Sequence, residues 1–215
     1  MIMSQGARPT FQKRSEQTRD KLVGALERLL HKKSFEEMTV AEIAAEAGVS
    51  PGSIYRRFKN KEAFIPVLFE LYLVRLEEWA LRPEAQVEIE GCELKEGLKL
   101  VSNAVLAQLQ HQKHILKAVY VYVRLRPDLM GDEWGQLEQQ SYASFRAIIE
   151  HFKAEVKHTD LNKAARMITA LFTSMFIEQG LFKDDAAPDE GALTNDELAE
   201  EVASMAYGYL TYGQS

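Results

Sequence analysis

Residues 39–64 constrain the fold of this chain most, because their cap residues define helix boundaries at short spacing. Thr39 and Glu42 have the spacing of a capping box, in which the hydroxyl and the carboxylate each bind a backbone amide at the start of a helix. A helix is therefore expected to begin at Val40. Gly48 can adopt the left-handed conformation that commonly ends a helix, so this first helix is short.

A second short helix is predicted directly after the turn. Ser50 is a preferred N-cap residue, and Pro51 suits the first helical position, where its missing amide costs nothing. Ile54 and Phe58 lie four residues apart and are expected to face the core, and Asn60 caps a third helix. Two short helices joined by a tight turn, with a third close behind, are typical of a helix-turn-helix that reads DNA.

Candidate DNA contacts lie on the outer surface of the second helix. We predict that Tyr55 contacts a phosphate, that Ser53 and Arg56 face base edges, and that Arg57 does either. Lys61 places a cation at a helix start, where the helix dipole disfavours it, which suggests a phosphate partner. The complete set of predicted DNA-binding residues is Thr39, Ser50, Gly52, Ser53, Tyr55, Arg56, Arg57 and Lys61.

The run T-V-x-x-I-A-x-x-A-G-V-S-x-G-x-I-Y-x-x-F-x-N-K-E, from Thr39 to Glu62, resembles the DNA-binding domain of the tetracycline-repressor (TetR) family of bacterial regulators. The resemblance spans about residues 14–65. Ser34 departs from it, since many members carry Gly before an aromatic such as Phe35, so the end of the first helix is expected to be capped differently. The resemblance implies a three-helix DNA-binding domain followed by a helical ligand-binding and dimerisation domain.

Charge divides the chain at the same place. Residues 1–61 contain twelve Lys or Arg and seven Asp or Glu residues, a net charge of +5, whereas the whole chain carries −6. Residues 62–215 therefore carry −11. An acidic part repels DNA phosphates and leaves the basic end to dock. We predict a DNA-binding domain over 1–61, with a basic N-terminal arm, and a second domain over 62–215.

Helical periodicity is strong along the whole chain, and strand alternation is nearly absent, which predicts an all-α fold of about nine helices. No apolar run has the length of a membrane span, and no export signal follows the basic N-terminus, so we expect a cytoplasmic protein. Outside residues 39–60, the expected helices cover 15–33, 61–81, 94–112, 114–125, 132–157, 160–183 and 195–213.

The last expected helix carries a narrow apolar seam. Leu198, Val202, Met205 and Tyr209 recur at spacings of three and four, which suits packing against another helix. The seam either fills the core of the monomer or forms a two-fold interface between two chains. The TetR resemblance favours the second alternative, so we predict that these four residues form a homodimer interface.

Aromatic residues are abundant in the second domain. Most are expected to be core, because an aromatic at helical spacing more often packs than lines a pocket. A pocket among them, with polar groups such as Glu178 or Gln179, would fit a small hydrophobic or aromatic effector whose identity the sequence leaves unknown. The predicted pocket residues, taken from the middles of helices, are Phe69, Tyr72, Tyr122, Tyr142 and Phe176.

Signals of an enzyme, a metal site or a cofactor are weak. His111 and His114 share a helical face, but no carboxylate or cysteine stands at ligand spacing in that helix. The single cysteine, Cys92, excludes an internal disulfide, and no nucleophile elbow, zinc-protease motif or phosphate-binding loop occurs. We expect no catalysis, no metal and no cofactor.

Together these features predict a homodimeric repressor that binds a palindromic operator in double-stranded DNA and leaves it when an effector binds. One alternative is a regulator of the same fold that activates, or that has lost ligand control. A second is a helical protein-interaction module whose helix-turn-helix is only structural, although the exposed cations argue against it.

Overall fold

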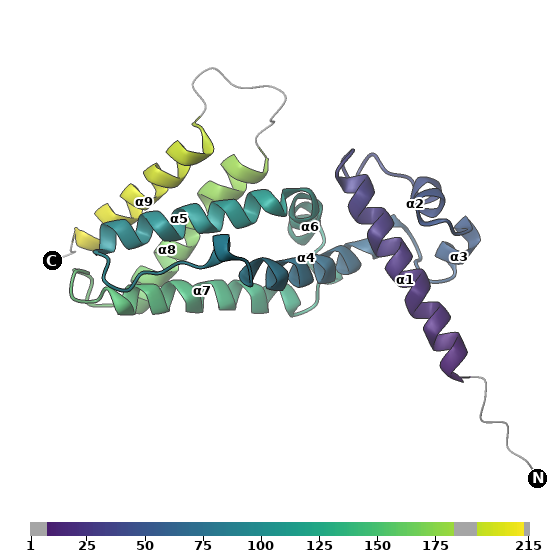
Figure 1. The fold of residues 1–215 in the computed structure, drawn as a ribbon, viewed down its shortest axis with the longest axis horizontal. Helices are drawn as coiled ribbons and strands as arrows, with labels where there is room; N and C mark the ends of the chain where they lie inside the picture. Colours follow the sequence, from purple (N-terminus) through teal and green to yellow (C-terminus); the bar gives the residue numbers. More distant parts are fainter. Residues whose placement is uncertain (1–7, 183–192, 213–215) are drawn as a thin grey trace, which may run out of the picture. The chain divides into compact units, whose positions relative to one another are not determined.

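The computed structural model describes residues 8–182 and 193–212, with side chains from residue 17 onward (Figure 1). These residues form nine α-helices and four short helical turns, and no strand occurs among them. The expected all-α fold is therefore confirmed.

The chain divides into two compact units. The first, which we call the reader unit, comprises residues 1–74 and 114–129; the second, the body unit, comprises 75–113 and 130–215. The chain thus passes between the units three times. The sequence pattern suggested one division after residue 61, because periodicity reveals a helix but not the unit in which it packs.

In the reader unit, the apolar face of the first helix packs on the first of two short helices, and the two short helices pack on each other. Leu22 and Leu26 of this helix are buried, and so are Phe35 and Met38 from the following loop. The helices of this unit are α1 (Arg8–Leu30), α2 (Val40–Ala47), α3 (Pro51–Tyr55), the 3-10 turn η1 (Lys61–Phe64), the first part of α4 (Ile65–Ala80), α6 (Lys113–Leu125) and the turn η3 (Pro127–Leu129).

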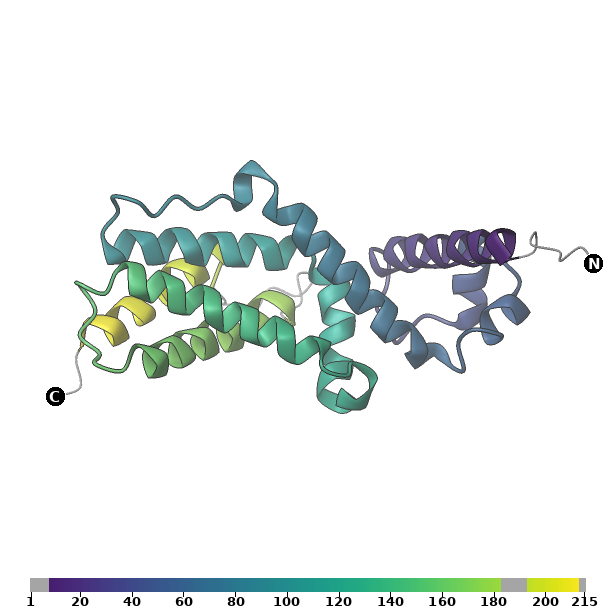
Figure 2. The same cartoon turned by 90° about the horizontal axis from the view of Figure 1, so that it is seen from below.

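In the body unit, α5 and α9 lie side by side, as do α7 and α8 (Figures 1 and 2). The Ser102 hydroxyl donates to the Ala199 carbonyl oxygen at 2.6 Å and joins the first pair inside the core. The elements of this unit are the end of α4, η2 (Pro83–Ala85), α5 (Leu94–His111), α7 (Glu133–His151), α8 (Leu161–Met175), the π-helical turn η4 (Phe176–Leu181) and α9 (Asn195–Thr211).

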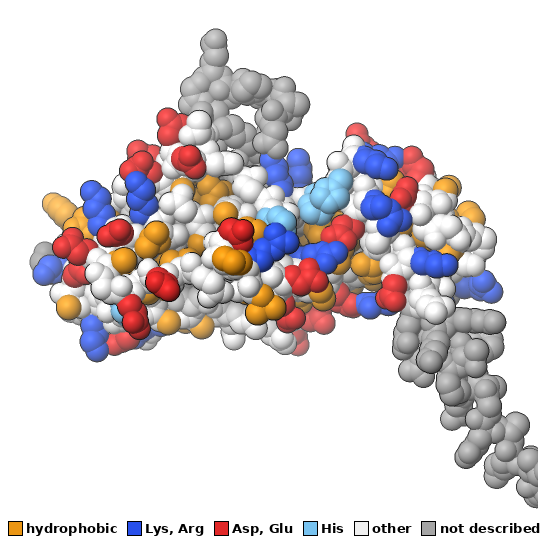
Figure 3. All heavy atoms as spheres, viewed as in Figure 1, with side chains coloured by type: hydrophobic (Ala, Val, Ile, Leu, Met, Phe, Trp, Pro, Cys, Tyr) orange, Lys and Arg blue, Asp and Glu red, His pale blue; other side chains and the backbone are white. Residues whose placement is uncertain are grey.

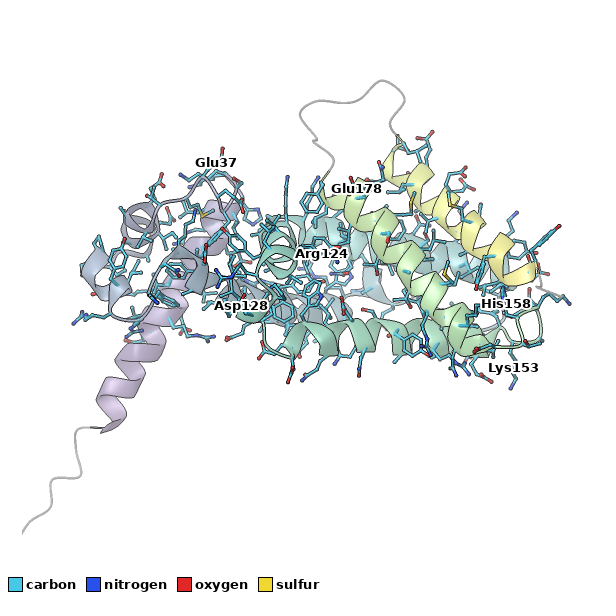
Figure 4. The ribbon with its side chains drawn as sticks, turned by 180° about the vertical axis from the view of Figure 1, so that it is seen from behind. Glu37, Arg124, Asp128, Lys153, His158 and Glu178 are labelled. Atoms are coloured by element: carbon cyan, nitrogen blue, oxygen red, sulfur yellow. The ribbon has the colours of Figure 1, made fainter. Side chains whose placement is uncertain are left out.

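Two helices end earlier than the periodicity suggests. α7 stops at His151, where Phe152 turns into the core, so residues 152–157 do not continue the helix. This turn carries Glu155, whose carboxylate accepts the Leu94 amide at 3.0 Å and caps α5. α8 changes to π-helical geometry after Met175. In that turn Glu178 and Gln179 are exposed, so neither is the inward-facing polar group that was expected (Figure 4).

Candidate DNA-binding interface

The start of α2 is fixed by the predicted capping box. The Thr39 hydroxyl accepts the Glu42 amide at 3.2 Å, and the Glu42 carboxylate accepts the Thr39 amide at 2.8 Å. Lys33 donates to the same carboxylate. The hydrogen bond from Lys33, followed by those from Thr39, lowers the pKa of Glu42 to about 2. The carboxylate is thus charged at neutral pH, near the positive end of the α2 dipole.

The turn between α2 and α3 has the predicted left-handed glycine. Gly48 has φ 64° and ψ 36°, and its amide donates to the Ala45 carbonyl oxygen at 3.1 Å while Val49 donates to Ala44 at 2.9 Å. These two bonds satisfy carbonyls that a helix end leaves free. After the turn, the Ser50 hydroxyl accepts the Ser53 amide at 3.3 Å and begins α3 at Pro51, as predicted.

The end of α1 is tied to α2 by contacts that the DNA-reading motif does not include. The Arg28 guanidinium donates from Nε to the Glu46 carboxylate at 2.6 Å and from Nη2 to the Glu46 carbonyl oxygen at 3.3 Å. The turn after α1 is closed by Ser34, whose amide and hydroxyl both donate to the Glu37 carboxylate at 2.9 Å. These hydrogen bonds lower the pKa of Glu37. Serine followed three residues later by glutamate was the signal for this turn in the sequence.

α3 and the two residues that follow it carry most of the predicted base and phosphate contacts. Gly52, Arg56 and Arg57 are exposed, and Tyr55 is 59% exposed. Lys59 is also exposed. It extends the cluster of Arg56 and Arg57 and was overlooked as a contact, although it stands in the same short run of the sequence. On the face drawn in Figure 3, Lys and Arg side chains occur over α1–α3 with acidic side chains between them.

Three hydroxyls among the predicted contacts already have partners. Those of Thr39 and Ser50 accept the capping amides described above. Ser53 is half-buried, its hydroxyl lying 2.9 Å from that of Ser50 and accepting from Arg56 Nη2 at 3.1 Å. The Ser53 hydroxyl therefore orients Arg56, which is the side chain of the two with the longer reach.

Lys61 does not have the expected role. Its ammonium donates to the carbonyl oxygens of Phe35 at 3.1 Å, Glu36 at 2.8 Å and Met38 at 3.1 Å, and it lies 5.1 Å from the centre of the Phe35 ring. An ammonium has three N–H donors, and all three are used within the protein. In this geometry no N–H donor of Lys61 is left for the predicted phosphate contact. Lys61 instead fixes the loop that leads into α2.

The five predicted pocket residues belong to different units. Phe69, Tyr72 and Tyr122 lie in the reader unit, and Tyr142 and Phe176 lie in the body unit. Neither unit therefore contains all five.

Tyr122 presents its ring edge to Phe35, with 5.6 Å between the ring centres. Phe176 is 1% exposed and packs against Phe172, whose ring also contacts Phe145. Phe69 and Tyr72 are likewise buried, with parallel rings 6.3 Å apart. The Tyr142 hydroxyl donates to Asn162 at 3.3 Å. Tyr122 and Phe176 are therefore packing residues in this structure.

The four residues of the predicted dimer seam differ in how far they are buried within one chain. Leu198 and Val202 are 2% and 0% exposed within one chain, because this face of α9 packs on α5, so they are core residues rather than an open interface. Tyr209 is half-buried, with its ring stacked on His158 at 4.3 Å (His158 is labelled in Figure 4). Met205 is 46% exposed and remains available to a partner.

The histidines contact rings. His114 stacks on His31 with 3.8 Å between ring centres, and His111 lies 4.8 Å from Trp79. No group of three or more potential metal ligands occurs in the ranges that the structure describes. Within the same ranges, every helix is too short or too polar to cross a membrane.

The helix-turn-helix segment is similar to segments of known proteins. Residues 22–66 match the family described as bacterial regulatory proteins, tetR family. The chain is 31% identical over 100 residues to YvkB, an uncharacterized HTH-type transcriptional regulator of Bacillus subtilis (strain 168), covering 46% of this chain and 49% of that one. It is 31% identical over 94 residues to the HTH-type transcriptional regulator TtgR of Pseudomonas putida, covering 43% and 45%. The chain thus spans about half the length of the curated relatives it matches.

The fold extends the likeness beyond these segments. The crystal structure of a bacterial regulatory protein in the tetR family from Rhodococcus RHA1 superposes with a TM-score of 0.60 at 18% identity. The superposition covers 92% of this chain and 98% of that one. At this level of identity the likeness concerns the fold alone.

Proposed function

We propose that this chain, which belongs to the TetR family of bacterial regulatory proteins, regulates transcription by binding DNA through α2 and α3. The observation that carries the proposal is the capped α2–turn–α3 segment, which leaves Tyr55, Arg56 and Arg57 exposed beside one another. The family consists of DNA-binding regulators and not of enzymes. A regulator of this kind acts where the chromosome is, so we place it in the cytoplasm.

In our proposal α3 enters the major groove. Arg56, oriented by Ser53, faces base edges, and Tyr55, Arg57 and Lys59 approach the phosphate backbone. Guanidinium groups pair with two acceptors of guanine, whereas phosphate contacts fix position without reading sequence. Lys61 is left out of the contact surface because its ammonium is engaged by the loop before α2.

A homodimer on a palindromic operator is the second part of the proposal. One α3 of five residues reads few base pairs, and a two-fold dimer doubles the contacts by reading two half-sites. Exposed apolar side chains on α8 and α9 support association. Met167 is 50% exposed and Met205 46% exposed, on helices that are neighbours in the body unit. We propose that these residues replace Leu198 and Val202 as the centre of the interface.

The third part of the proposal is that the protein is a repressor and that a small effector releases it from the operator. One observation in the body unit supports a ligand. Gln112 is 1% exposed, and its Nε2 has no hydrogen-bond partner among the described residues, although its Oε1 accepts from Gln108 at 3.0 Å. A buried donor left unpaired is costly, so a water or an effector with an acceptor oxygen is expected there.

The test begins with DNA selected from a random library by the purified protein. Binding is then measured by fluorescence anisotropy between about 50 and 200 mM salt. Arg56→Ala should weaken binding by about 1–3 kcal/mol and loosen discrimination at one operator position. Lys95→Ala, which removes an exposed cation from α5 in the body unit, is the matched control and should leave binding unchanged.

The alternatives give different results. A regulator without ligand control would bind the selected DNA, but no lipophilic compound would release it or raise its melting temperature. An activator would bind equally well and would raise transcription in a reporter assay. A protein-interaction module would select no sequence and show no salt-dependent binding, and the proposal would then fall.

A further inference from the structure

Helix α6 belongs to the same compact unit as α2 and α3, although more than fifty residues separate it from them in the sequence. Residues 114–129 belong to the reader unit, whereas α5, which α6 follows after the single residue Gln112, belongs to the body unit. After η3 the chain returns to the body unit at Met130. The reader unit is thus continuous with the body unit at both ends of this segment, as well as through α4.

Two side chains near the end of α6 contact the reader. The first is Tyr122, whose ring packs edge-on against Phe35 in the loop before α2. Burial raises the pKa of the Tyr122 hydroxyl, and the carboxylates of Glu36 and Glu62 raise it further. The phenol therefore stays neutral and packs as an uncharged ring against the loop before α2.

The second is Arg126, which follows the last residue of α6. Its Nη1 donates to the Glu62 carboxylate in η1 at 3.1 Å. Its Nε and Nη2 donate to the two carboxylate oxygens of Asp128 at 2.9 and 2.8 Å (Asp128 is labelled in Figure 4). The bidentate pair with Asp128 holds the guanidinium plane, so that its remaining edge is presented to Glu62.

Tyr122 contacts the loop before α2 directly, whereas Arg126 contacts Glu62, whose neighbour Lys61 binds the same loop. Lys61, adjacent to Glu62, holds the carbonyl oxygens of Phe35, Glu36 and Met38, and its ammonium lies over the Phe35 ring. Met38 directly precedes Thr39, the residue that caps α2. A displacement of Tyr122 or Arg126 would therefore act on the segment that fixes where α2 begins.

We propose that Tyr122 and Arg126, which we call the α6 anchor, are positioning residues that hold α2 and α3 in the arrangement that reads DNA. Any change that moves the end of α6 loosens the loop at residues 35–38 and thereby the start of α2. The regulatory part of this inference rests on the proposed DNA-binding function. The structural part, that the α6 anchor stabilises α2, does not.

The structural part is tested on the full-length protein by hydrogen exchange of the α2 and α3 amides, without DNA. A partly exposed ion pair is worth little, so Arg126→Ala should speed exchange about two- to fivefold. Tyr122→Leu removes a ring pair and should speed it about two- to tenfold. Arg124→Ala is the matched control, because Arg124 lies on the same helix but donates to Tyr120 there, at 2.8 Å. It should leave exchange unchanged.

A double-mutant cycle then assigns the effect to the pair. If Arg126 acts through Glu62, Glu62→Gln added to Arg126→Ala should speed exchange little beyond the single variant. Equal exchange in the Arg126→Ala, Tyr122→Leu and Arg124→Ala variants would overturn the proposal.

Operator affinity measured on the same variants separates the two claims. The anchor variants should bind the selected DNA more weakly than the wild type and than Arg124→Ala. Faster exchange with unchanged affinity would overturn the regulatory part. A wild-type protein that binds no DNA would instead defeat the proposed function, and the exchange results would still decide whether the anchor stabilises α2.

Discussion

Replacement of Lys61 by methionine separates most sharply the role found in the structure from the role suggested by the sequence. The change keeps most of the aliphatic stem and removes the ammonium with its three hydrogen bonds. Two of these bonds, to Phe35 and Met38, are partly buried, and the bond to Glu36 is exposed. Hydrogen bonds from charged groups contribute about 1.5–3 kcal/mol each when desolvated.

Counting the two partly buried bonds near the lower end of that range, and neglecting the exposed one, we expect Lys61→Met to destabilise the reader unit by about 3 kcal/mol. Hydrogen exchange of the α2 amides measures this loss directly. Urea unfolding followed by far-UV circular dichroism gives a second estimate. Both tryptophans, Trp79 and Trp134, lie in the body unit, so their fluorescence reports on that unit separately.

Lys59→Met is the matched control, because Lys59 is exposed two residues away. It should change stability by no more than about 0.5 kcal/mol. A phosphate contact at Lys61 would predict the opposite pattern for Lys61→Met. The stability without DNA would be unchanged, and the slope of log affinity for DNA against log salt concentration would fall by about one unit. If Lys61→Met were as stable as wild type, the argument from the three carbonyls would be refuted.

Three further predictions concern other parts of the chain. Lys33 and Thr39 lower the pKa of Glu42 in the folded protein, so the charged Glu42 stabilises the fold at pH values above its ordinary pKa of 4.5. This stabilisation is lost as the pH falls towards about 2. The free energy of unfolding, measured from pH 7 to 2, should therefore depend less on acid in Glu42→Gln than in the wild type. If the proposed dimer forms, Met205→Glu should shift it towards monomer in analytical ultracentrifugation without lowering the melting temperature. Val202→Glu should instead unfold the chain, because that position is buried before any association. Phe176→Ala should cost about 3–5 kcal/mol in urea unfolding, and a loss below about 1 kcal/mol would restore it as a pocket residue.

The amino-acid sequence by itself determined the helix-turn-helix, because its boundaries depend on contacts between residues three or four apart. Thr39 binds Glu42, Ser50 binds Ser53, and Gly48 adopts the left-handed conformation for which it is suited. Each of these features follows from the local chain and was predicted to the residue. The apolar periodicity of the longer helices is local in the same sense, so the all-α fold was also available from the sequence.

Tertiary structure alone decided what covers each apolar face and where each long side chain finds its partner. Lys61 bonds carbonyls more than twenty residues earlier in the chain, a distance at which spacing carries no information. The sequence likewise showed that Val202 lies on an apolar stripe, but only the packing of α9 on α5 showed that its own chain covers it. The same holds for Arg126, which joins η1 because α6 folds back into the reader unit. Capping is a local equilibrium, whereas burial and ion pairing depend on which distant segments the whole fold brings together.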